Sequence, residues 1–108
     1  MAQDFERSIA RNVGTSAVTI MTSNSDDTNI GLNLANVHTS QITVSVFVTV
    51  SGADYYWIKN APIPEGSSLQ ILDGGGKFVL QSGDAVKVQS NTANSVDVWM
   101  SVVDAIST

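Results

Sequence analysis

Residues 61–88 read A-P-I-P-E-G-S-S-L-Q-I-L-D-G-G-G-K-F-V-L-Q-S-G-D-A-V-K-V, and this stretch decides the fold class. It contains both prolines and five of the eight glycines, and three short apolar runs lie between these turn-forming residues. Two tight reversals in so few residues predict antiparallel strands, because parallel strands need a long crossover connection. We expect the strands on either side of this stretch to pack against it.

The clearest single strand is predicted at Ile42–Val50, I-T-V-S-V-F-V-T-V, which has β-branched residues at nearly every position. Its alternation places Ile42 and the valines on one face and the remaining residues on the other. A turn at residues 51–54 then leads into a return strand at residues 55–59. The two predicted faces of that return strand carry Tyr55, Trp57 and Lys59, and Tyr56 and Ile58.

Further short strands are predicted at residues 17–21, 29–35, 69–72, 78–80, 85–89 and 96–103, separated by polar turns. Residues 22–29 are all polar and are expected to form a loop. The prolines make residues 60–66 an edge or crossing connection. Seven to nine strands predict an all-β fold, an antiparallel β-sandwich whose strand order is either jelly-roll or immunoglobulin-like. We expect one sandwich domain at residues 12–108 after an N-terminal arm or edge segment at residues 1–11.

The charge and composition exclude several classes of function. The net charge is −5, which argues against binding to nucleic-acid phosphates or to anionic membranes. The chain has no cysteine, so it can form neither a disulfide nor a thiolate metal site. The N-terminus does not read as a signal peptide, and no apolar run approaches the ~18 residues of a membrane helix. We expect a protein that is made and used without export.

Four motifs could be interpreted as binding or catalytic sites, and each also has a simpler structural interpretation. The glycines before Lys77 resemble a phosphate loop, but Phe78 follows where Ser or Thr is required, so a hairpin turn is favoured. Gly83-Asp84 is interpreted as a turn. Asp26-Asp27 lacks the spaced acids of a calcium loop and is interpreted as solvated. His38 is the one histidine and is expected at the surface. We therefore expect no enzyme activity, metal, cofactor or small-molecule substrate.

Binding to other proteins is the function that remains for the large aromatic and arginine side chains. The N-terminal segment offers Phe5, Arg7 and Arg11, and the hairpin offers Tyr55, Tyr56 and Trp57. We predict these six as interface residues, since aromatic and arginine side chains dominate protein interfaces. An alternative is a carbohydrate-binding module in which Tyr55 and Trp57 stack on sugar rings beside Asp54.

Three stretches of the sequence resemble those of a known group of proteins. They are K-N-A-P-I-P-E-G-S-S-L (59–69), K-F-V-L-Q-S-G-D-A-V-K-V-Q-S (77–90) and S-V-D-V-W-M-S-V-V-D-A-I (95–106). With N-V-G-T-S-A-V-T (12–19) and L-A-N (34–36), the chain resembles small virion structural proteins of tailed phages along nearly its whole length. The nearest are those of contractile-tailed phages of cyanobacteria.

This resemblance implies a non-enzymatic building block of the virion, assembled in the host cytoplasm and present in many copies, with a homo-oligomer as one alternative. Its partners would be the major capsid protein or other virion proteins. The role implied first is that of a capsid decoration or cement protein. A tail, neck or fibre component is the alternative within the same class.

Overall fold

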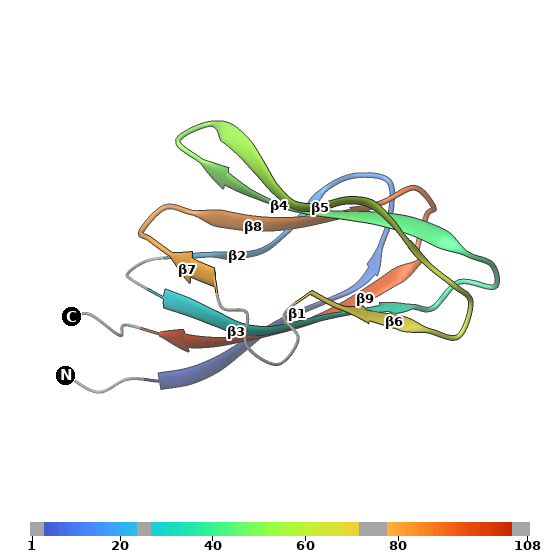
Figure 1. Ribbon diagram of the computed structural model, residues 1–108, viewed down its shortest axis with the longest axis horizontal. Helices are drawn as coiled ribbons and strands as arrows, with labels where there is room; N and C mark the ends of the chain where they lie inside the picture. The colour runs from blue at the N-terminus through green and yellow to red at the C-terminus, as the bar shows by residue number, and fades with distance from the viewer. Residues whose placement is uncertain (1–3, 24–26, 72–77, 105–108) are drawn as a thin grey trace.

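The computed structural model describes residues 4–23, 27–71 and 78–104, and this part of the chain forms two antiparallel β-sheets packed face to face (Figure 1). The strands are β1 (Asp4–Val13), β2 (Val18–Thr22), β3 (Asp27–Asn36), β4 (Ile42–Val50), β5 (Ala53–Ile63), β6 (Ser68–Gln70), β7 (Phe78–Leu80), β8 (Ala85–Ser90) and β9 (Val96–Asp104). The predicted all-β sandwich is confirmed. Within the described residues, no helix is long and apolar enough to cross a membrane.

The strands pair in a nested order. One sheet has the order β1-β9-β3-β6, with β7 also paired to β3, and the other has the order β2-β8-β4-β5. The first strand therefore pairs with the last, the second with the next to last, and so on inwards to the β4–β5 hairpin. In an immunoglobulin fold the first two strands lie side by side in one sheet. Here β1 and β2 lie in different sheets, so the immunoglobulin order is excluded.

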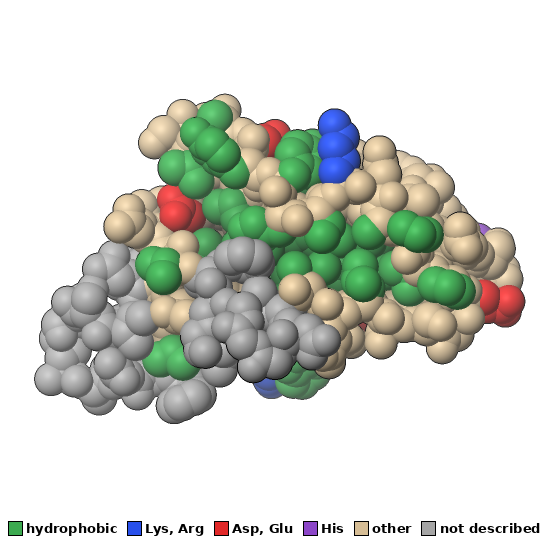
Figure 2. Space-filling model, in the orientation of Figure 1, with side chains coloured by type: hydrophobic (Ala, Val, Ile, Leu, Met, Phe, Trp, Pro, Cys, Tyr) green, Lys and Arg blue, Asp and Glu red, His purple; other side chains and the backbone are tan. Residues whose placement is uncertain are grey.

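The core lies between the two sheets and follows the predicted alternation. The four inward-facing residues Ile42, Val44, Val46 and Val48 are buried, whereas Val50 is only half-buried because β8 pairs with β4 no further than Thr49. The opposite sheet contributes its own alternating set from β3 and β9: Leu32, Leu34, Val96, Val98, Met100 and Val102. Apolar side chains also reach the surface along the opening between the sheets (Figure 2).

The polar stretch before β3 is the first place where the sequence-based prediction is wrong. It predicts a loop over residues 22–29, but β3 begins at Asp27, and Thr28 pairs with both neighbouring strands. Asp27 is only 1% exposed, and its carboxylate accepts a hydrogen bond of 2.7 Å from the Ser23 hydroxyl. A polar side chain can be buried when it is hydrogen-bonded, so polar composition did not exclude a strand here.

The return strand β5 also differs from its prediction, which ended the strand at residue 59. It continues past Pro62 to Ile63, which is possible because β5 is the edge strand of its sheet. Its register against β4 shifts twice, between Val44 and Val46 and again between Val46 and Phe47. These bulges break the alternation, so Trp57 and Ile58 both pack against the core and not on opposite faces as predicted.

The turns predicted at residues 51–54 and at Gly83-Asp84 are present, but the first is shorter than predicted because β5 begins at Ala53. Ser51 (φ 51°) and Gly52 (φ 84°) form the two-residue connection of the β4–β5 hairpin, in which both central residues require positive φ. Gly83 has φ 94°, and the Asp84 carboxylate accepts the backbone N–H of Gln81 at 2.9 Å. The glycine turn at residues 73–76 lies outside the described residues. The N-terminal segment is an edge strand, since β1 runs from Asp4 to Val13 along β9.

The hairpin turn allows a paired test of this backbone geometry. The Gly52→Ala substitution should lower the free energy of unfolding by about 1 kcal/mol, because an alanine in left-handed conformation is strained by about that amount. Nothing lies within 4 Å of an added Cβ, so the cost is conformational and not steric. The Ser51→Gly control should not destabilise to a similar degree, since Ser51 already holds positive φ. Thermal unfolding would show a decrease of roughly 4–8 °C for Gly52→Ala alone; equal losses in both variants would contradict this geometry.

Candidate interaction surfaces

Two of the exposed large apolar side chains lie together on the outer face of the first sheet. Ile9 of β1 is 53% exposed and Trp99 of β9 is 51% exposed, and the two lie opposite each other in the antiparallel register. Trp99 points outward because its neighbours Val98 and Met100 are buried in the core. We call Arg7, Ile9, Arg11, Asp97 and Trp99 the Trp99 patch.

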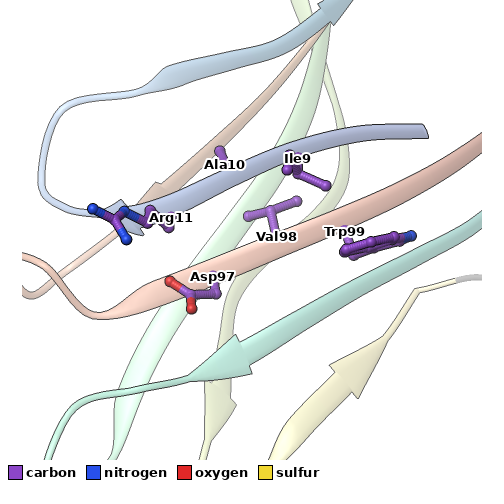
Figure 3. A pocket seen from close by; sticks show the side chains of 6 residues that line it. All are labelled: Ile9, Ala10, Arg11, Asp97, Val98 and Trp99. Carbon is purple, nitrogen blue, oxygen red and sulfur yellow. The ribbon is translucent and has the colours of Figure 1, made fainter.

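The patch surrounds a shallow hollow of about 400 Å³ between β1 and β9 (Figure 3). Its lining comes from three consecutive residues of each strand: Ile9, Ala10, Arg11, Asp97, Val98 and Trp99. Most of the lining is apolar, with Arg11 and Asp97 at one end and Trp99 at the other (Figure 3). A hollow of this kind suits an apolar side chain from a partner protein.

Two arginines give this face positive charge on a protein of net charge −5. The Arg7 guanidinium lies 5.3 Å from the centroid of the Trp99 ring, a cation–π contact worth ~0.5–1 kcal/mol at an exposed site. The contact restrains the indole ring before any partner arrives, which lowers the entropy cost of binding. The Asp97 carboxylate accepts the backbone N–H of Asn12 at 3.0 Å, so it is partly satisfied within the chain.

Small side chains flank the patch on β3. In register, Asn33 lies opposite Trp99, Gly31 opposite Ser101, and Ala35 opposite Asp97. The indole therefore lies beside low-profile neighbours and is accessible to a partner. A protruding tryptophan with an adjacent arginine is the composition typical of an interface hot spot.

The predicted interface residues fall on two different sheets. Arg7 and Arg11 are exposed in the Trp99 patch, and Phe5 lies opposite Val103 in β1, its side chain outside the described part. Tyr55 and Tyr56 are 60% and 45% exposed, but they belong to β5 of the other sheet. The structure therefore does not bring the six together as one surface.

Trp99 and Ile9 were absent from the predicted interface. The alternation of buried valines in β9 could have placed Trp99 on the solvent face. Nothing local could have placed Ile9 beside it, because their strands lie at opposite ends of the chain.

The hairpin residues are largely engaged within the domain. The Tyr56 ring lies 4.9 Å from the Phe47 ring, and the Lys59 ammonium lies 5.1 Å from the Tyr56 centroid. Trp57 packs against the core, and the Asp54 carboxylate accepts a 2.7 Å hydrogen bond from the Thr49 hydroxyl. Tyr55, Trp57 and Asp54 therefore do not form the open sugar platform that the sequence suggested.

The other candidate sites also have structural roles. Asp27 is buried against Ser23 and is not in a solvated loop, which corrects the interpretation of this residue, whereas Asp26 lies outside the described residues. His38 is half-buried, and its backbone N–H bonds the Asn36 side chain at 2.8 Å. Among the described residues, no three His, Cys, Asp or Glu side chains come together as a possible metal site.

Comparisons with known proteins place the fold but not a family. No protein-family model matches the sequence, and no curated protein matches it. Among solved structures, the chain is similar to a chain in the acid-stable capsid structure of the Helicobacter pylori bacteriophage KHP30, with a TM-score of 0.57 and 13% identity. The match covers 95% of this chain and 87% of that one, so the two domains share one fold over nearly their full lengths.

The two tryptophans allow a test of the surface geometry in solution. In the Trp57→Phe variant only Trp99 emits, and its fluorescence should be quenched strongly by acrylamide because half of its surface is exposed. In the matched Trp99→Phe variant only the half-buried Trp57 emits, and its quenching constant should be clearly lower. The reverse order would mean that the Trp99 patch is covered.

Proposed function

We propose that this protein is a structural component of a bacteriophage particle and that it decorates the outer surface of the capsid lattice. The observation that carries the proposal is the fold likeness to a phage capsid chain over 95% and 87% of the two lengths. The resemblance of the sequence to small virion proteins of tailed phages points the same way. A virion location and binding to other virion proteins follow from this proposal.

The strand order supports the same assignment. We assign the nested pairing of β1 with β9, β2 with β8, and β3 with both β6 and β7 to the jelly-roll type, in which β6 and β7 together occupy one strand position. Jelly rolls recur in viral capsid proteins. Fold alone does not specify function, which depends on the side chains that the surface presents to a partner.

The Trp99 patch is the surface we assign to the capsid. It lies on the outer face of the edge strand β1 and its neighbour β9, where a partner can approach without disturbing the core. Trp99 and Ile9 supply apolar contact, and Arg7 and Arg11 favour a partner with acidic groups near its apolar surface. A decoration protein that contacts several lattice subunits binds the assembled shell better than the free subunits, and so stabilises the shell.

Copy number in purified particles tests the proposal directly. Quantitative mass spectrometry of particles from the phage that carries this protein should find it in amounts comparable to the major capsid protein. A single ring of copies at one vertex would assign it to the neck, tail or a fibre instead. Absence from intact particles would overturn the virion role altogether.

The patch itself can be tested by substitution. Trp99→Ala should weaken binding to shells lacking the protein by about 30-fold, which corresponds to about 2 kcal/mol for a hot-spot aromatic residue. The matched control is Tyr55→Ala, an aromatic on the other sheet that is 60% exposed, compared with 51% for Trp99, and it should retain near-native affinity. Thermal unfolding of both variants confirms that they remain folded. If Tyr55→Ala is the damaging substitution, the binding face has been assigned to the wrong sheet.

A further inference from the structure

A second hollow, of about 210 Å³, lies on the second sheet where β4, β5 and β8 meet. Every residue that lines it has a hydroxyl or a carboxamide side chain: Thr43, Ser45, Asn60, Gln89, Ser90 and Asn91. No charged or aromatic residue belongs to the lining. This composition differs sharply from the apolar hollow of the Trp99 patch.

The hollow is produced by the bulge in β5. The register passes from Val44 opposite Ala61 to Val46 opposite Ile58, which leaves Asn60 outside the regular ladder. Asn60 adopts φ 54°, and its backbone N–H donates to the Ser45 hydroxyl at 3.0 Å. Bulges with positive φ in residues other than glycine cost free energy and often occur at functional sites, where they redirect a side chain.

Across the hollow from Asn60, the side-chain amides of Asn91 and Gln89 are each held in place by a hydrogen bond at one end. Asn91 accepts the backbone N–H of Thr43 at 3.0 Å through Oδ1, and Gln89 donates through Nε2 to the Thr15 carbonyl at 2.8 Å. Within the described residues, no hydrogen bond engages Asn91 Nδ2, Gln89 Oε1 or the Asn60 carboxamide. The wall therefore offers oriented donors and acceptors to a ligand.

We propose that this hollow binds one ring of a neutral carbohydrate. Sugar hydroxyls donate and accept hydrogen bonds, as do the Thr43 hydroxyl and the side-chain amides of Asn60, Gln89 and Asn91. The Ser90 hydroxyl is bonded to Ser95 inside the sandwich and is not available to a ligand. The absence of lysine, arginine and carboxylate from the lining disfavours a charged ligand. The polar groups converge from three strands on a compact space, which suits a ring with hydroxyls around its rim better than an extended peptide.

The inference stands independently of the capsid proposal, since the two hollows lie on different sheets. A single ring held by a few hydrogen bonds binds weakly, with a dissociation constant of about 1 mM. If the protein is also carried in many copies on a particle, such sites would add up to firm attachment to a glycan surface.

The test is an NMR titration of the ¹⁵N-labelled protein with neutral tetrasaccharides from glucan, mannan, galactan and chitin, and with a sialylated trisaccharide as the charged comparison. One or more neutral sugars should shift the backbone amide signals of Thr43, Asn60 and Asn91 together. If none of the neutral sugars shifts these signals, or the sialylated sugar alone does, the proposal is overturned.

Two substitutions keep the fold and remove ligand contacts. Asn60→Gly retains a residue that accepts positive φ while deleting the carboxamide, and Thr43→Val deletes a hydroxyl at constant shape. Each should weaken binding at least several-fold. Thr19→Val, on β2 of the same sheet and outside the hollow, should leave the affinity unchanged. Undiminished binding in both hollow variants would place the sugar elsewhere and overturn the assignment.

Discussion

The packing of the two inner sheet faces is the constraint on which everything else in this protein depends. Val46 and Val88 of one sheet and Leu34 and Met100 of the other are all completely buried. Burial of such side chains contributes roughly 1.5–3 kcal/mol each before entropy is counted. Because a strand that supplies one face to the core must turn its alternate residues outward, the same packing presents two outer faces to solvent. Those outer faces can differ in chemistry at little cost to the fold, and they do.

Buried polar groups connect the sheets at their ends. The Asn36 side chain donates 2.9 Å hydrogen bonds to the carbonyls of Ser40 and Ile63, joining the end of β3 to the end of β5 across the sandwich. The Ser90 and Ser95 hydroxyls bond each other at 2.6 Å, and the Ser95 N–H bonds the Val13 carbonyl at 3.0 Å. Satisfied in this way, such groups can be buried and help to specify one alignment of the sheets. Among the buried side-chain atoms of the described residues, Asn29 Nδ2 is without a partner.

The two outer faces suit different partners. The Trp99 patch combines an exposed indole, an aliphatic neighbour and two arginines, which favours a protein surface with apolar and acidic groups. The hollow around Asn60 contains only neutral hydrogen-bonding groups, which favours a hydroxylated ligand. Since the faces point away from each other, a protein bound to a shell through the first would leave the second exposed to the surroundings.

The sequence by itself determined the fold class, the positions of most strands and the turns at Gly52 and Gly83. These follow from local physics, because side-chain alternation and positive φ are properties of a few consecutive residues. The tertiary structure decided which strands became neighbours, and so placed Ile9 beside Trp99 and buried Asp27 against Ser23. It also introduced the β5 bulge that turned Trp57 inward and shaped the hollow around Asn60. Strand partners are selected by the packing summed over residues far apart in the chain, and no short stretch of sequence contains that sum.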